Sequence, residues 1–141
     1  MIEKVHLAIE ANKKSIRYAM DGNKEAWLAL YTEDALVADP VGISLMDESG
    51  KGHRGKAAIA QFWDHIIANA TLEIRVDKRW TSGDFCCCVA QVAKNDMGDG
   101  NFTECDMLAT YEVNEDGLIT CMKAHWCFDD MMDQLAKLGA A

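Results

Sequence analysis

The chain has 141 residues, a length that fits one domain with its own hydrophobic core. Half of the residues are hydrophobic and 26% are charged, which excludes a disordered chain, a collagen-like repeat and a disulfide-dense miniprotein. The formal net charge of −9 repels phosphate backbones and anionic lipid headgroups, so neither nucleic acid nor a membrane is an expected partner. No apolar run approaches the roughly 18 residues of a membrane span, and no signal-peptide core begins the chain. We therefore expect a cytoplasmic protein in which residues 1–141 form a single domain.

Two helices are predicted at the start of the chain. Apolar residues at helical spacing predict the first over residues 3–21, with Gly22 as its terminating residue. Asn23 is a suitable N-cap for a second helix over residues 24–31.

The next segment mixes turns, one short strand and a helix. Residues 32–34 predict a turn, and residues 35–39 predict a strand that Pro40 stops. The run of turn formers at 47–53 predicts a loop. One apolar face over residues 56–69 predicts a third helix.

The second half is rich in strands joined by turns. A final helix to Leu138 is predicted with Asp129 as its cap. Turns are expected at residues 82–84, 95–100 and 114–117. They separate four predicted strands at residues 71–81, 85–94, 101–113 and 118–128. Helices first and a strand meander last predict an α+β fold, in which a curved antiparallel sheet wraps around packed helices.

Strand alternation sorts the last two strands into two faces. One face is apolar and aromatic and carries Ala109, Tyr111, Met122, Ala124 and Trp126. Such a face suits a flat hydrophobic ligand that has one or two oxygens. The opposite face is more polar and carries His125.

The sequence contains no pattern that indicates a metal or a cofactor. None of the six cysteines has the CxxC spacing, and neither HxH nor HExxH occurs, so reduced cysteines that act as small hydrophobes are expected. His65 is expected on a helix face that Phe62 does not share. A dehydratase would need a histidine, here His65 or His125, on the apolar face that would bind its substrate. Strand alternation places His125 on the opposite face.

Three segments resemble a known family. Residues 34–42, which end in Asp-Pro-Val-Gly, resemble the corresponding segment of ketosteroid isomerases. Residues 55–63 and 117–124 resemble the helix and the final strand of the same enzymes, which belong to the NTF2-like (SnoaL-like) superfamily. The resemblance implies an NTF2-like cone with an apolar pocket and a homodimer formed through the convex sheet face.

The resemblance also implies a site that keeps its base and loses its usual oxyanion donors. Asp39 falls on the position of the general base that moves a proton next to a carbonyl. The family's catalytic tyrosine falls on Ser15, its protonated aspartate on Ala109, and its supporting tyrosine on Trp63. Removing one such donor costs several kcal/mol of transition-state stabilisation, so we expect low or altered activity.

Other side chains offer replacement donors. Tyr18 lies one helical turn after Ser15, Tyr31 falls on a second network tyrosine of some relatives, and Trp63 and Trp126 carry indole N–H groups. Core packing is the alternative role for each of them. The expected substrate-binding set is therefore Ser15, Tyr18, Tyr31, Phe62, Trp63, Ala109, Tyr111, Met122, Ala124 and Trp126.

Three functions follow from these residues. The first is an enzyme of the steroid delta-isomerase type that uses Asp39 on a hydrophobic, steroid-like or polycyclic ketone. The second is a non-catalytic binder of the same kind of ligand. The third is a polyketide cyclase, dehydratase or hydrolase, since one fold supports many chemistries.

Overall fold

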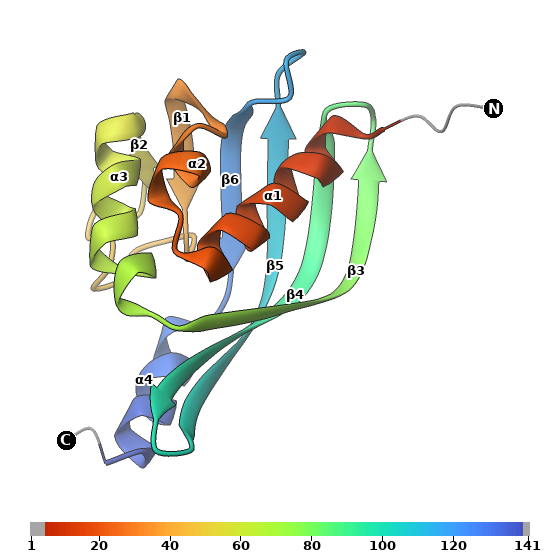
Figure 1. Cartoon of the computed structure of the whole chain (residues 1–141). Coiled ribbons are helices and arrows are strands. Elements are labelled where there is room, and N and C mark those ends of the chain that lie inside the picture. The colour runs from red at the N-terminus through yellow and green to blue at the C-terminus, as the bar shows by residue number, and fades with distance from the viewer. Residues whose placement is uncertain (1–4, 140–141) are drawn as a thin grey trace.

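The computed structural model describes residues 5–139 and contains one curved sheet with helices packed against one face (Figure 1). The sheet order is β2-β1-β6-β5-β4-β3, and this six-stranded arrangement confirms the predicted α+β class. The strands are β1 (Tyr31–Ala38), β2 (His53–Arg54), β3 (Leu72–Ser82), β4 (Cys86–Gly98), β5 (Asn101–Val113) and β6 (Ile119–His125).

The sheet is mostly antiparallel, as the sequence predicted, with one parallel pair. β1 and β6 pair in parallel, while the other neighbouring strands pair antiparallel. A bulge between Val76 and Lys78 interrupts the β3–β4 ladder, and such bulges increase the local bend. The long strands β3, β4 and β5 accordingly curve around the helices, as Figure 1 shows.

Helix α1 (Leu7–Asp21) crosses the concave face of the sheet (Figure 1). The His6 ring caps its first turn by accepting a hydrogen bond from the Ile9 N–H at 3.4 Å. Gly22 ends it in the left-handed conformation with φ 70°, as the sequence predicted. The Asn23 side chain caps α2 (Lys24–Leu28), which is also as predicted.

Helix α3 (Lys56–His65) and the short 3-10 helix η1 (Ile67–Asn69) complete the layer over the sheet. An aromatic cluster ties the helices to β1. The Trp27 ring lies 4.8 Å from the Tyr31 ring and 5.1 Å from the Trp63 ring, measured between centroids. All three side chains are buried, so this cluster is the centre of the core between helices and sheet.

Helix α4 (Phe128–Lys137) lies at the far end of the sheet, next to the β4–β5 hairpin (Figure 1). Strand β6 ends at His125, so the start of β5 has no β6 partner on that side. The Gln134 side chain takes that place. Its Oε1 accepts from the Glu104 N–H at 2.8 Å, and its Nε2 donates to the Glu104 carbonyl at 2.7 Å.

Several predicted boundaries in the first half were wrong. The first helix begins at Leu7, and the predicted start at residue 3 lies outside the described residues. The second ends at Leu28, and Tyr31 with residues 32–34 belongs to β1 instead of a helix end and a turn. Pairing with β6 stabilises that strand, and a local pattern does not contain this information.

The remaining differences lie at turns and caps. The third helix stops at His65, and the segment to Asn69 is a 3-10 turn. Residues 95–98 continue β4 because they pair with β5, although their composition is typical of a turn. Cys127, not Asp129, is the N-cap of α4. Within residues 5–139, no helix has the length and apolar content needed to cross a membrane.

Candidate functional site

A cavity of about 410 Å³ lies between the helices and the concave face of the sheet. This volume falls within the roughly 300–1,000 Å³ of small-molecule sites. Most of the wall is apolar, with contributions from α1, α3, β3, β4, β5, β6 and α4. Of the site residues chosen from the sequence, the wall contains Ser15, Asp39, Phe62, Ala109, Tyr111, Met122, Ala124 and Trp126.

Asp39 is the acidic residue of this wall. It directly follows β1 and precedes Pro40, and its half-buried carboxylate lines the cavity. The indole N–H of Trp126 donates a hydrogen bond of 2.5 Å to Asp39 Oδ1. Burial raises the pKa of Asp39 from 3.8 to about 6, and the hydrogen bond from Trp126 limits that rise. A carboxylate with this pKa is ionised near neutral pH and is matched to accepting and returning a proton.

Ser15 forms a second polar position, on α1. Its hydroxyl oxygen accepts a hydrogen bond from the Trp27 indole N–H at 3.2 Å and one from the Tyr111 hydroxyl at 3.5 Å. Both lone pairs of the Ser15 oxygen are then used, and neither of these two contacts engages its proton. Burial raises the pKa of Tyr111 in spite of the opposing effects of Ser15 and Asn12, so the Tyr111 hydroxyl stays protonated.

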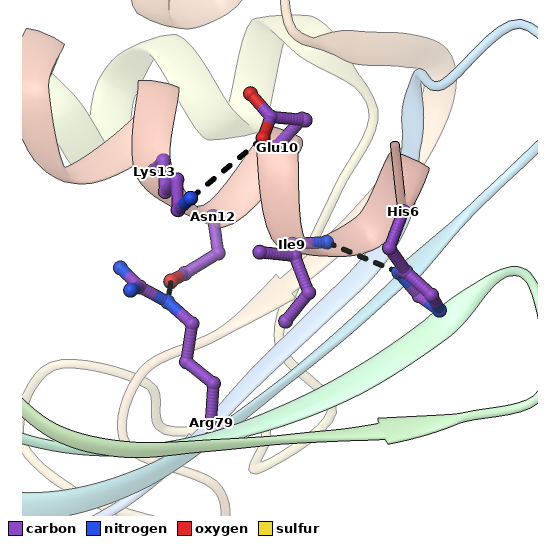
Figure 2. A network of polar contacts seen from close by, with 6 residues as sticks. All are labelled: His6, Ile9, Glu10, Asn12, Lys13 and Arg79. Atoms are coloured by element: carbon purple, nitrogen blue, oxygen red, sulfur yellow. Dashed lines mark hydrogen bonds and ion pairs between the residues drawn. The ribbon is translucent and has the colours of Figure 1, made fainter. Parts of the chain in front are cut away.

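The position of Ser15 depends on how α1 is held against the sheet. Asn12, one turn before Ser15, is fully buried, and its Oδ1 accepts from Arg79 Nε of β3 at 2.9 Å. Figure 2 shows the Arg79 side chain reaching from β3 to Asn12, while the ion pair between Lys13 and Glu10 lies on another side of the helix. The contact between Arg79 and Asn12 therefore fixes the turn of α1 that carries Ser15.

Three of the predicted site residues do not line the cavity: Tyr18, Tyr31 and Trp63. Trp27 packs against both Tyr31 and Trp63 and itself forms part of the wall, so it occupies the position nearest the cavity. Ser15, Ile16 and Ala19 of α1 line the cavity. At about 100° per residue, Tyr18 lies roughly 60° from Ser15 and roughly 160° from Ile16, on the side of the helix away from the middle of that face.

Tyr31 is nevertheless close to the polar cluster. Burial raises its pKa well above the ordinary value of 10.0, Tyr111 raises it further, and Ser15 lowers it. Its buried hydroxyl makes no hydrogen bond of ordinary geometry to another described residue. Tyr31 packs against Trp27 and does not line the cavity.

His65 does line the cavity together with Phe62, which corrects the expectation of separate faces. The two residues are three positions apart on α3, and residues at that spacing share a helix face. The His65 side chain is exposed, so it lies at the rim.

Sequence reasoning missed the part of the wall that β4 and the first half of β5 form. Gln91, Thr103, Cys105 and Met107 all contribute there. Extending the alternation back from Ala109 finds the three β5 residues, and the β4–β5 register then adds Gln91 opposite Met107. Burial raises the pKa of Cys105 to about 12, and nearby Asp39 raises it as well, so this thiol is neutral.

The chemistry available in this wall is narrow. In the part of the chain that the structure describes, no three His, Cys, Asp or Glu side chains converge on a metal-sized site. The wall combines the Asp39 carboxylate, the Ser15 hydroxyl that two donors support, a few further polar groups such as the hydroxyls of Tyr111 and Thr103, and a large apolar surface. This combination can hold a flat molecule and move a proton on it.

The sequence profile of the SnoaL-like domain matches residues 14–122. A curated relative, a steroid Delta-isomerase from Nocardioides simplex, is 29% identical over 115 residues, which are 79% of this chain and 82% of that protein.

Two solved structures are similar over most of the chain. The Delta 5-3-ketosteroid isomerase from Mycobacterium sp. has a TM-score of 0.82 and 31% identity, with 89% of this chain and 96% of that chain covered. The complex of RV0760c from Mycobacterium tuberculosis with estradiol-17beta-hemisuccinate has a TM-score of 0.82 and 31% identity, with 89% and 97% covered.

Proposed function

Because this chain belongs to the SnoaL-like domain family, we propose that its cavity binds a flat, steroid-like molecule and that Asp39 moves a proton between two of its carbons. The NTF2-like fold expected from the sequence is confirmed by the likeness to the ketosteroid isomerase structure. The observation that carries the proposal is the Asp39 carboxylate, which lines an apolar cavity and has its pKa raised to about 6.

The proposed reaction is an intramolecular isomerisation of a β,γ-unsaturated ketone. Asp39 takes a proton from the carbon next to the carbonyl, and the electrons of that C–H bond enter a dienolate. The protonated Asp39 then returns the proton to the γ carbon, which restores the carbonyl and conjugates the double bond. The carboxylate starts and finishes ionised, as its pKa of about 6 permits at neutral pH.

Ser15 is the proposed donor to the ligand oxygen. The hydrogen bonds from Trp27 and Tyr111 orient the Ser15 hydroxyl and leave its proton for the dienolate oxygen. Ala109, also in the wall, provides no second donor. Since one lost oxyanion donor typically costs about 10²–10³ in kcat, we expect slower turnover than a site with two donors would support.

The test is turnover of a β,γ-unsaturated 3-ketosteroid, followed by absorbance of the conjugated product. Asp39→Asn should lower kcat/KM at least about 100-fold, because it removes the base and keeps the side-chain shape. Asp21→Asn, which removes an exposed carboxylate at the end of α1, is the matched control and should leave turnover unchanged. Equal turnover by wild type and Asp39→Asn would remove Asp39 from the mechanism.

The second candidate function is binding without catalysis, which the presence of Ala109 and Ser15 at the donor positions favours. A planar phenol imitates the dienolate and should bind to wild type in either case. Binding without turnover supports the carrier, and turnover that depends on Asp39 supports the isomerase. Failure of the phenol to bind would overturn both functions.

A homodimer through the convex sheet face is also part of the proposal. Leu108 and Trp80, 48% and 42% exposed, give this face an apolar centre. Sedimentation should show a dimer that Leu108→Lys dissociates and that Val41→Lys, a change at an exposed apolar residue elsewhere, leaves intact. A monomeric wild type would contradict this assembly. A cytoplasmic location stays a prediction from the sequence.

A further inference from the structure

Gln91 places an amide oxygen without a hydrogen-bond partner in the cavity wall. The side chain is 7% exposed and projects from β4 into the wall. Its Nε2 donates to the Met107 sulfur at 3.4 Å. Its Oε1 is buried and has no hydrogen-bond partner among residues 5–139.

An unpaired amide oxygen is unfavourable at such a position. A buried acceptor without a donor carries the full cost of its lost hydration, and a thioether is a weak acceptor for the amide N–H. Val89 and Ala93, two residues away on the same strand face, show that apolar side chains fit this surface of β4. The amide oxygen of Gln91 is therefore available for a partner that enters the cavity.

Gln91 and Asp39 stand on different parts of the wall. Asp39 follows β1, and strands β6 and β5 lie between β1 and β4. Three strand spacings of about 4.8 Å give about 14 Å along the sheet, and the curvature shortens the direct path. A flat ligand that lies across this face of the sheet can therefore contact both residues, one toward each of its ends.

We propose that Gln91 Oε1 accepts a hydrogen bond from a hydroxyl group at the end of the ligand remote from the oxygen that Ser15 binds. Gln91 is then a specificity residue that selects hydroxylated ligands over otherwise identical deoxygenated ones. This inference rests on the proposed function, because it takes the ligand to be a flat hydrophobic molecule oriented by Ser15 and Asp39.

The test uses two phenolic steroids that differ in one group: estradiol, with a hydroxyl at carbon 17, and its 17-deoxy counterpart. Wild type should bind estradiol about tenfold more tightly, the equivalent of one buried hydrogen bond. Gln91→Met keeps the length of the side chain and removes the acceptor. This variant should lose the preference by weakening estradiol binding, while binding of the deoxy compound is unchanged or stronger.

A matched control separates the amide from cavity shape. Ile74→Val also alters the wall by a small apolar change on the neighbouring strand β3. It should change both affinities by the same factor and keep the tenfold preference. Gln91→Met should unfold at the same temperature as wild type or at a higher one, because it removes an unpaired buried acceptor.

A second measurement uses the wild-type protein and does not depend on whether a variant folds. In ¹⁵N-labelled wild type, the Gln91 side-chain amide resonance should shift with estradiol and stay in place with the deoxy compound. Binding of both steroids with equal affinity, or a preference that survives in Gln91→Met, overturns the role of Gln91 and leaves the proposed function standing. Binding of neither steroid overturns the proposed function and this inference with it.

Discussion

Asp39 and Ser15 are both polar groups in the wall of one apolar cavity, yet their surroundings act on them in opposite ways. Asp39 carries a charge, has one hydrogen bond from Trp126, and has its pKa raised by burial. Ser15 is uncharged and receives hydrogen bonds from Trp27 and Tyr111. Burial in the folded protein therefore disfavours the ionised Asp39 carboxylate, whereas two hydrogen bonds stabilise the Ser15 hydroxyl there.

Asp39 and Ser15 therefore contribute to the stability of the folded protein with opposite signs. A buried carboxylate with a raised pKa disfavours the folded state whenever it is ionised. A buried hydroxyl with satisfied partners favours the folded state, and its removal leaves donors unpaired. Substitutions at the two positions should therefore change stability in opposite directions.

The largest expected effect is at Asp39. Its pKa of about 6 exceeds the ordinary 3.8 by about two units, which corresponds to at most about 3 kcal/mol, less where solvent reaches the half-buried carboxylate. Because the folded pKa is raised, the protonated form of Asp39 favours the folded state. This contribution of protonation to the free energy of unfolding is fully present below about pH 4 and is lost as the pH rises through about 6. Asp39→Asn should thus be more stable than wild type at pH 8 and equal to it at pH 4. Urea unfolding at both pH values measures the difference.

The matched control for that experiment is Asp21→Asn, an exposed carboxylate. Its stability should follow that of wild type at both pH values. If Asp39→Asn shows the same pH dependence as wild type, the carboxylate is not strained and the comparison with Ser15 fails.

The next effect is at Ser15. Ser15→Ala removes the acceptor of the Trp27 indole and of the Tyr111 hydroxyl, so two buried donors lose their partner. We expect a loss of about 2 kcal/mol in the free energy of unfolding, measured by urea titration. Ser82→Ala, at an exposed strand end, should change it by less than about 0.5 kcal/mol. A Ser15→Ala protein as stable as wild type would show that this cluster contributes nothing.

Trp126 gives a smaller effect that refines the account of Asp39. Trp126→Phe keeps an aromatic ring and removes the N–H that donates to the carboxylate. Because that hydrogen bond lowers the pKa of Asp39, its loss should raise the pKa further above about 6. A ¹³C NMR titration of the Asp39 carboxyl group measures this shift. Trp80→Phe, on the convex face, is the control, and an equal midpoint in all three proteins would contradict the role of Trp126.

The smallest effect is at Tyr111. Its hydrogen bond to Ser15 is long, at 3.5 Å, and such bonds are weak. Tyr111→Phe should lower the free energy of unfolding by about 0.5 kcal/mol, and Trp27→Phe, which removes the shorter bond and leaves a void, should lower it by more. The reverse order, measured under the same conditions, would show that the Tyr111 hydroxyl is the principal partner of Ser15.

Local patterns in the sequence were sufficient for the elements that local chemistry determines. The bounds of β5 were predicted correctly, since turn residues flank it on both sides. The alternation that placed Ala109 and Ala124 on one face also needs only the strand period, and both residues line the cavity. Gly22 and Asn23 act within one turn of their own positions.

The features that were missed depend on contacts between distant residues. The hydrogen bond between Trp126 and Asp39 joins positions 87 residues apart. Tyr31 belongs to a strand because of its pairing with β6. Of the cluster formed by Trp27, Tyr31 and Trp63, it is Trp27 that reaches the cavity, since it packs over the other two. Gln91 enters the site only through the register of β4 against β5.

The contact between Gln134 and Glu104 has a consequence for association between molecules. The start of β5 extends past the end of β6 and would otherwise present a row of unpaired backbone groups, which are templates for strand addition. The Gln134 amide occupies both backbone groups of Glu104 in the manner of a neighbouring strand. Met131 and Leu135 on the same helix line the cavity. Removal of α4 therefore opens the cavity and uncovers an aggregation-prone strand edge at once, so solubility and ligand retention should be lost together.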